Sequence, residues 1–399
     1  MILLKLLRSA IESILLFSYD TFEYVRDVWA VNFRQRHRVV ERETKGEQAR
    51  PAEGLRVAIV ALYPTSESLP FTKNLLRMLH SNGFFVLAIS TRKLPDKVHA
   101  SILLDCHHLI ERVGVGRDFG SYKMGIAWIQ RQESYFSGIE TLLLANDSNF
   151  VPKAFEDEFK VMLQDQAEWQ CLFENFEFHY HAQSFFLLFR KAVFSNPAFR
   201  SFWKNYRPYS SRRHSINQGE VKLSSVLRRA GYTAKARYNS TQIFNTITSR
   251  IKEQGVFRIA ELSPSSGMWK GSRGKILDSL IKSATANYEG AKPKDFDNDL
   301  TIGMTPSSME LKRWPNVICH SAETMNPTHG LALIANNFLA APIKRDVCYR
   351  GVFDIAQILL FAHGFSDAEM KAMAIDLNQR GLPASVTGIR RLFLKYGRI

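Results

Sequence analysis

The chain of 399 residues has few cysteines and lacks the short motifs of common nucleotide-binding folds. Its four cysteines lie far apart without a CxxC pair, so the sequence favours neither a zinc ribbon nor a disulfide framework and fits a reducing compartment. They are Cys106, Cys171, Cys319 and Cys348. Neither a GxxxxGK(S/T) phosphate loop nor a complete GxGxxG fingerprint occurs, which removes the main support for a P-loop ATPase or an ordinary dinucleotide-binding enzyme.

Long apolar runs are also missing. No uninterrupted apolar stretch approaches the roughly 20 residues that a helix needs to span a bilayer. The most apolar segment, MILLKLLRSAIESILLF, is interrupted by Lys5, Arg8 and Glu12, and no signal-peptide cleavage site follows it. Its apolar residues recur at helical spacing, so residues 1–32 predict an amphipathic helix. This helix either lies on a membrane surface with its cations toward anionic lipid, or packs against the protein's own core or a second subunit.

The chain carries an excess of positive charge. Its 53 Lys and Arg outnumber its 38 Asp and Glu, for a formal net charge of +15, which calls for an anionic partner. The basic residues are spread along the chain, and no nucleic-acid-binding motif organises them. We therefore expect a phosphorylated substrate or a phospholipid surface, and no specific nucleic acid.

The order of apolar and polar segments predicts the domain organisation. Residues 33–54 are charged and then broken by Pro and Gly, which is typical of a linker. Residues 55–346 are expected to form an α/β domain, a Rossmann-type sheet flanked by helices, because apolar runs alternate with helical patterns. Residues 347–399 predict a helical C-terminal extension. Strands are expected at 55–64, 84–91, 107–113 and 139–147, and helices within 71–83 and 120–132.

The strand expected at 139–147 ends in Asn146, Asp147 and Ser148. Ligands of open α/β sheets bind beyond the carboxyl ends of the strands, so these side chains are candidates for a binding site. A carboxylate there suits Mg²⁺ or Mn²⁺ held against a diphosphate, since both ions prefer oxygen ligands. The alternative is a simple turn cap after a strand.

A second candidate is the glycine-flanked loop that places Arg117 and Asp118 just before a helix. Backbone N–H groups and an arginine fork at such a place can bind phosphate, and the aspartate can accept from a sugar or base hydroxyl. A capped turn with a surface ion pair is the alternative.

Several blocks, in this order, resemble the rhamnan synthesis protein F family over roughly residues 55–350. They are GRDFGSYKMGI, LLLANDSNFVP, HAQSFFLLFRKAVF with FRSFWKNY, GEVKLSSVLRRAGY and NPTHGLALIANNFLAAPIKRDV. The family is regarded as glycosyltransferases of the GT-A type. The resemblance implies a GT-A-like mixed sheet and a nucleotide-sugar donor, dTDP-rhamnose above all. It further implies a lipid-linked, polysaccharide or lipopolysaccharide O-antigen acceptor, at the cytoplasmic, inner face of a bacterial plasma membrane.

The resemblance also implies roles for single residues. Asp147, with Asn146 and Ser148, falls at the place of the metal-binding DxD element. One carboxylate stands where the usual motif has two, which leaves metal-independent catalysis open. The family's HxQS block is expected to line the acceptor or sugar pocket, although a core histidine and a buried hydrogen bond would explain it as well. Its members here are His181, Gln183 and Ser184.

Glu220 precedes the helical pattern KLSSVLRRAGY, as the catalytic base does in inverting GT-A enzymes, and Asp118 is the next candidate for that role. An acid in a first helical turn is also favoured by the helix dipole alone. His329 is expected to complete the metal site with Asp147, unless it is merely exposed beside a helix cap. Lys344 and Arg345 are expected to neutralise the departing diphosphate, unless they are simply solvated.

Two other functions stay open at this point. The single carboxylate at 147 also fits a scaffold of a polysaccharide assembly complex that has lost catalysis. A basic nucleic-acid-binding protein is the less favoured alternative, because the chain lacks a recognised motif.

Overall fold

The computed structural model describes residues 2–48, 56–64, 70–132, 138–176, 179–264 and 326–395. Cys319 and residues 265–315, for which the sequence indicates no clear element, lie outside these ranges. The other three cysteines are buried and free, in agreement with the absence of a predicted disulfide framework.

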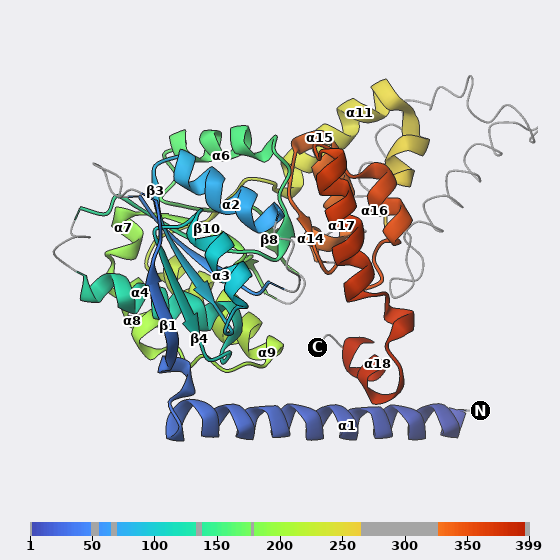
Figure 1. Cartoon of the computed structure of the whole chain (residues 1–399). Helices are drawn as coiled ribbons and strands as arrows, with labels where there is room; N and C mark the ends of the chain where they lie inside the picture. Colours follow the sequence, from blue (N-terminus) through green and yellow to red (C-terminus); the bar gives the residue numbers. More distant parts are fainter. Residues whose placement is uncertain are drawn as a thin grey trace, which may run out of the picture.

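The centre of the molecule is an eight-stranded mixed sheet in the order β1-β4-β3-β2-β5-β10-β7-β11 (Figure 1). Strands β4, β3, β2 and β5 run parallel, as expected of the alternating strand and helix pattern. β1 and β10 run antiparallel to their neighbours and make the sheet mixed. The bounds are β1 Val40–Lys45, β2 Arg56–Leu62, β3 Phe84–Ser90, β4 His108–Arg112, β5 Thr141–Asn146, β7 Trp169–Cys171, β10 Phe186–Arg190 and β11 Lys235–Ala236.

Helices cover both faces of the sheet. Side chains alternate along a strand, so in β2 Ala58 and Val60 belong to one core, whereas Val57 and Ile59 belong to the other. The first core is closed by α2 Pro70–Ser81, α3 Asp96–Leu103 and α6 Phe155–Gln164. The second is closed by α4 Arg117–Arg131, α7 Lys191–Phe194, α8 Pro197–Asn205 and α10 Lys222–Arg229. Burial on both faces explains why the central strands are almost continuously apolar.

The C-terminal part is helical, as predicted, and is packed onto the domain. Ile358, Met373 and Leu377 belong to the same core as α2 and α6, so these helices are part of the domain's core. The elements are α11 Ser240–Glu261, α14 Pro327–Gly330, α15 Ala332–Leu339, α16 Ile355–Phe361, α17 Asp367–Arg380, η5 Pro383–Ser385 and α18 Gly388–Lys395. With the mixed sheet and the N-terminal helix, they confirm the predicted fold class.

The segment 33–54, predicted to be a linker, is partly a strand of the domain. After the short helices η1 Trp29–Phe33 and η2 Arg36–Arg38, β1 pairs with β4 at the edge of the sheet. Arg42 of β1 donates to the buried carboxylate of Glu111, at 2.7 Å. The prediction failed here because an edge strand with one solvated face shows no apolar run. The domain therefore begins before Leu55.

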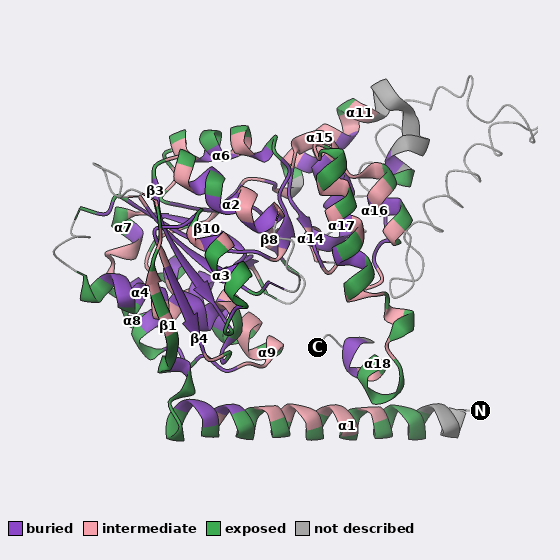
Figure 2. Cartoon of the chain, in the orientation of Figure 1, coloured by how far each residue is buried: buried purple, intermediate pink, exposed green. Residues whose placement is uncertain are grey.

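Helix α1, Ile2–Val28, is long and straight and lies along one side of the molecule (Figure 1). Most of α1 is exposed or half-buried (Figure 2). Its burial is the reverse of an ordinary surface helix, since apolar side chains face solvent and acidic ones are shielded. Ile14 and Phe17 are 64% and 74% exposed, whereas the side chains of Glu23 and Asp27 are 13% and 2% exposed. The side chains of residues 2–5, Lys5 included, lie outside the described part.

Two aromatic side chains of α1 contact other parts of the molecule. The ring of Tyr19 lies 4.1 Å from that of Phe393 in α18, and the ring of Tyr24 meets that of Tyr209 edge-on at 5.8 Å. Among the described residues, no helix is long and apolar enough to cross a membrane.

Candidate functional site

Candidate site residues from distant stretches of the chain meet at the carboxyl end of β5. Asn146 is the last residue of β5, and its Nδ2 donates to Oδ2 of Asp118 at 2.7 Å. Its Oδ1 accepts from the backbone N–H and the hydroxyl of Ser148. The Asn146 amide thus joins the first turn of α4 to the turn that follows β5, as the position of both segments in the sheet predicts.

Lys344 enters the site through a second, two-stranded sheet. β12, Ile343–Lys344, pairs antiparallel with β6, Asn149–Phe150, which sets Lys344 opposite Asn149. Its Nζ donates to Oγ of Ser148 at 2.9 Å and lies 4.7 Å from the centre of the Phe185 ring. The lysine is therefore held in place rather than free in solvent, which removes the simple solvated alternative for this residue.

Glu220 lies in the π-helix η3, Ser215–Val221, directly before α10. Its Oε1 accepts from the backbone N–H of Ser184 at 3.0 Å and from the Ser184 hydroxyl at 2.6 Å. Its Oε2 is 3.7 Å from Nε2 of His181. The neighbouring Gly219 lets η3 pack closely against α4, because a Cβ there would come within 2.8 Å of the Phe119 ring. One carboxylate oxygen is thus fixed, while the other faces a histidine.

The charges of the site act on one another. Burial raises the pKa of Asp118, and Arg117, Lys344 and the Asn146 hydrogen bond oppose this effect. Burial lowers the pKa of Lys344, while the nearby carboxylates of Asp346, Asp118 and Glu220 oppose that shift. Acids and cations from separate segments therefore sense each other at one place. Arg117 itself is exposed and adopts a left-handed backbone with φ of 50°.

Two further charged residues belong to this group and were not predicted. Arg212, in α9 Arg212–His214, interacts with Asp346, Arg117 and Glu220, and burial lowers its pKa to about 10. Burial favours the neutral form of Asp346, but His329, Arg350 and Lys344 take its pKa well below the usual value. In the sequence Arg212 is visible only as half of a basic pair, and Asp346 only as the acid that follows Lys344-Arg345.

Asp147 lies close enough to this group of charges to interact with Asp118, but its larger charged partner is the buried cation Arg345. Oδ1 of Asp147 accepts from the backbone N–H of Tyr63 at 3.0 Å, and its Oδ2 has no hydrogen-bond partner among the described residues. Burial raises the pKa of Asp147, and the charge of Arg345 opposes the shift. Arg345 is 6% exposed and lies over the rings of Phe71 and Phe150. Arg345 is therefore a core cation, and its expected contact with a departing diphosphate is not supported by its position.

Among the described residues, no hydrogen bond or ion pair joins the two predicted metal ligands, Asp147 and His329. Nε2 of His329 lies 2.9 Å from Oδ1 of Asp346, whereas Asp147 interacts with Arg345. In the part of the chain that the structure describes, no three His, Cys, Asp or Glu side chains are grouped so that they could hold a metal ion. The free Oδ2 of Asp147 is an oxygen donor of the right kind, but its neighbouring charge is already a cation. These residues do not fit a metal site made by protein side chains.

Gln183 connects the HxQS block to the NPTH block. Its Nε2 donates to Oδ1 of Asn326 at 2.7 Å, and the same oxygen caps the short helix α14 by accepting from Thr328 N. His181 Nδ1 is 2.8 Å from the carbonyl of His179. Gln183 therefore has the buried hydrogen bond that was its alternative explanation, while His181 remains beside Glu220.

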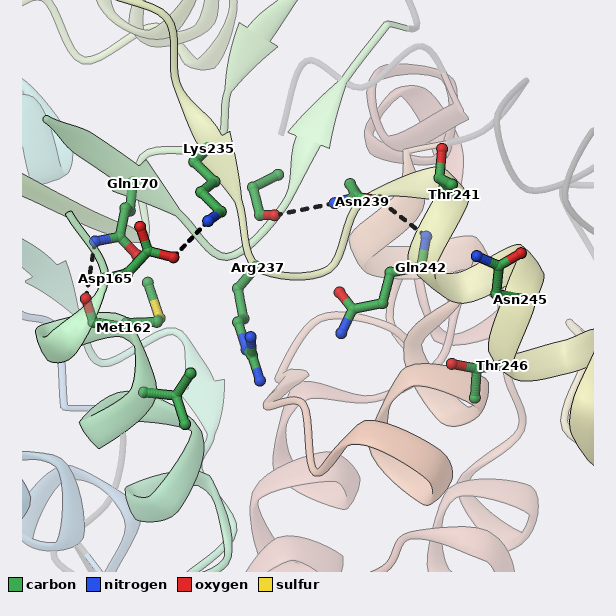
Figure 3. A pocket seen from close by; sticks show the side chains of 12 residues that line it. Met162, Asp165, Gln170, Lys235, Arg237, Asn239, Thr241, Gln242, Asn245 and Thr246 are labelled. Atoms are coloured by element: carbon green, nitrogen blue, oxygen red, sulfur yellow. Dashed lines mark hydrogen bonds and ion pairs between the residues drawn. The ribbon is translucent and has the colours of Figure 1, made fainter. Parts of the chain in front are cut away.

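A cavity of about 470 Å³ lies elsewhere, between α6, β11 and α11 (Figure 3). Its lining includes Asp165, Lys235, Gln242 and Asn245, and it shares no residue with the group described above. Lys235 and Asp165, side by side in its wall, form an ion pair (Figure 3). Several of its polar groups are thus already engaged with one another.

Two solved structures show a distant likeness to the chain. A mannosyltransferase from Pyrobaculum calidifontis in complex with GDP-Man and Mn²⁺ is 10% identical, with a TM-score of 0.29, over 93% of this chain and 98% of that one. A putative glucose-1-phosphate thymidylyltransferase from Bacillus anthracis in complex with a sucrose is 11% identical, with a TM-score of 0.27, over 46% of this chain and 87% of that one. Likeness at these TM-scores bears on neither the fold nor the activity.

Sequence comparisons are more informative. The uncharacterized protein y4gN of Sinorhizobium fredii is 27% identical over 187 residues, 46% of this chain and 48% of that protein. The chain thus spans about half the length of this curated relative. The family model for rhamnan synthesis protein F matches residues 86–255, which include Asp118, Asn146, Ser184 and Glu220. The resemblance predicted from the sequence is therefore confirmed over residues 86–255, the part of this chain that matches the rhamnan synthesis protein F family.

Proposed function

We propose that the protein is a glycosyltransferase that moves a deoxyhexose from a nucleotide-sugar donor, dTDP-rhamnose in the first place, to a polysaccharide or lipid-linked O-antigen acceptor. The observation that carries this proposal is the meeting of two carboxylates, Asp118 and Glu220, with the cations Lys344, Arg117 and Arg212 at the carboxyl end of β5. Sugar transfer from a nucleotide needs a base for the acceptor and positive charge for the leaving diphosphate. The match to the rhamnan synthesis protein F family supports the same conclusion.

In this proposal Glu220 is the general base. Ser184 holds Oε1, so Oε2 is the oxygen that accepts the proton of the acceptor hydroxyl. The acceptor oxygen then attacks the anomeric carbon from the face opposite the nucleotide, which inverts the configuration. Lys344, Arg117 and Arg212 compensate the charge that develops on the diphosphate by charge-assisted hydrogen bonds. No step is assigned to a metal ion, because the described side chains do not form a site for one.

We further propose that α1 seats the enzyme on the inner face of a bacterial membrane. Its outward apolar side chains, such as Ile11, Ile14 and Phe17, would enter the headgroup boundary. Directly after α1, Arg34 lies 4.1 Å over the ring of Trp29, and both residues are exposed. Tryptophan is typical of the membrane–water interface. Arg36 and Arg38 follow it and are also exposed, so the charge there complements anionic lipid. Among the occupants that could cover this face, an anionic bilayer fits both the apolar stripe and the cations.

The decisive experiment is transfer by purified protein from a panel of nucleotide sugars, with the product anomer read by NMR. We expect turnover with dTDP-rhamnose or another nucleotide deoxyhexose and an inverted anomeric centre. A retained configuration would remove Glu220 as the base of a single displacement. Failure to transfer or hydrolyse any donor would instead favour the non-catalytic scaffold.

A further inference from the structure

One buried carboxylate connects α1 with the candidate site. Asp27 lies in the last turn of α1, and its side chain is 2% exposed. Its Oδ2 accepts from the backbone N–H of Ser210 at 2.8 Å and of Ser211 at 3.1 Å. A charged acceptor with two backbone donors is stronger than an ordinary hydrogen bond, so α1 and the segment 208–212 are held together at this point.

The segment 208–212 in turn connects to the two parts of the chain that carry Asp118 and Arg212. The hydroxyl of Ser210 accepts from the backbone N–H of Gly116 at 3.1 Å, directly before Arg117 and Asp118. The hydroxyl of Ser211 caps α9, the helix that begins with Arg212. Two hydrogen bonds from one carboxylate therefore lead to the acid Asp118 on one side and to the cation Arg212 on the other.

The turn at Gly116 can pass a shift of the segment 208–212 on to Arg117 and Asp118, because it is closely packed against that segment. Gly116 has φ of 86°, and a Cβ there would come within 2.4 Å of Pro208. The buried guanidinium of Arg112 donates to the carbonyls of Val115 at 2.6 Å and Arg117 at 2.7 Å. Arg112 holds the turn on its buried side. On the other side the turn is positioned by its contacts with the segment 208–212.

We propose that Asp27 is a positioning residue, through which the seat of α1 on a lipid surface sets the geometry of Arg117, Asp118 and Arg212. The lipid half of this inference rests on the proposed membrane function. The link between α1 and the site rests on the hydrogen bonds alone. Binding of α1 to lipid orders the segment 208–212 and with it the Gly116 turn. The enzyme is therefore most active at the membrane, where the proposed lipid-linked acceptor lies.

The link can be tested without substrate by amide hydrogen exchange of the full chain. Asp27→Ala should exchange about tenfold faster over residues 113–121, the size expected when charge-assisted hydrogen bonds are lost. Asp27→Asn keeps an acceptor oxygen and should restore protection, and Glu12→Ala, an acid of the same helix, should behave as wild type. Equal protection in all variants, or equal acceleration in the core strand β3, would overturn the proposal.

Ser210→Ala provides a milder variant should Asp27→Ala fold poorly. It removes only the bond to Gly116, so exchange should rise over 113–121 and stay unchanged over 208–212. Adding phosphatidylglycerol-containing vesicles should protect both segments in wild type but only 208–212 in Ser210→Ala. Vesicle binding without protection of 113–121 in wild type would overturn the coupling. Lack of vesicle binding would refute the membrane function, while the lipid-free variants would still decide the role of Asp27.

Discussion

Ser184 donates its backbone N–H and its hydroxyl to the same oxygen of Glu220, at 3.0 and 2.6 Å. This arrangement orients the carboxylate from the side of the sheet. In the proposed reaction the acceptor hydroxyl then approaches Oε2 of Glu220, so the base acts in one fixed orientation.

Glu220→Gln should lower kcat by about 10²–10⁴-fold while donor affinity changes little, because only proton removal is lost. Ser184→Ala should cost less, about tenfold, since the base remains but is held loosely. Steady-state kinetics and dTDP binding by calorimetry measure both effects. Glu140→Gln, on the exposed surface, is the matched control. Loss of dTDP binding in Glu220→Gln would make Glu220 a donor ligand instead of the base.

Asn146→Ala should shift the acid limb of the kcat/KM profile to higher pH. Burial raises the pKa of Asp118, and the Asn146 hydrogen bond holds it down, so losing that bond raises the pKa further. Asp118, the second candidate for the base, is then ionised only at higher pH. The exposed Asn378→Ala should leave the profile unchanged. An unmoved acid limb in Asn146→Ala would show that Asp118 does not titrate in the reaction.

Lys344→Met should raise KM for the nucleotide sugar by about 10–100-fold, because a charge-assisted contact to phosphate is lost. Burial lowers the pKa of Lys344, and Asp346 is the strongest opposing charge. Asp346→Asn should therefore move the alkaline limb of donor binding to lower pH. The exposed Lys191→Met is the control. An unchanged KM would separate Lys344 from the donor.

Asp147→Asn should abolish transfer while leaving the Tm nearly unchanged. The amide oxygen still accepts from Tyr63 N–H, so only the charge at the end of β5 is removed. Activity assays with calorimetry distinguish the two effects, and Asp157→Asn on the surface of α6 is the control. Wild-type turnover would assign Asp147 to joining the ends of β2 and β5 alone.

Ile14→Glu and Phe17→Glu should each reduce sedimentation with phosphatidylglycerol-containing vesicles by about tenfold or more, because a charge enters the apolar face of α1. Leu360→Glu, as exposed but on α16, should bind like wild type. Substitution is a sharper test than deleting residues 1–50, which would remove β1 and leave Glu111 without Arg42. Unchanged binding by both Ile14→Glu and Phe17→Glu would exclude α1 as the lipid contact.

Strands β2, β3 and β5 were predictable because a strand buried on both faces must be apolar at nearly every position. The same logic failed for β1, where solvent covers one face and the sequence VERETK looks like a linker. The sequence also indicated that Asn146 ends a strand and that Asp118 lies at the start of a helix, and the structure joins the two side chains by a hydrogen bond.

The sequence by itself determined the α/β class, the amphipathic character of residues 1–32 and the types of residue available for chemistry. Only the tertiary structure decided their directions. It brought Lys344 to the site and buried the adjacent Arg345 in the core. Lys344 ends β12, Arg345 continues the extended pairing by donating its N–H to the Ser148 carbonyl, and successive side chains of an extended segment point to opposite faces. It also turned the apolar side of α1 toward solvent. It joined Asp27 to Ser210, which lie 183 positions apart, so no local sequence pattern encodes their contact.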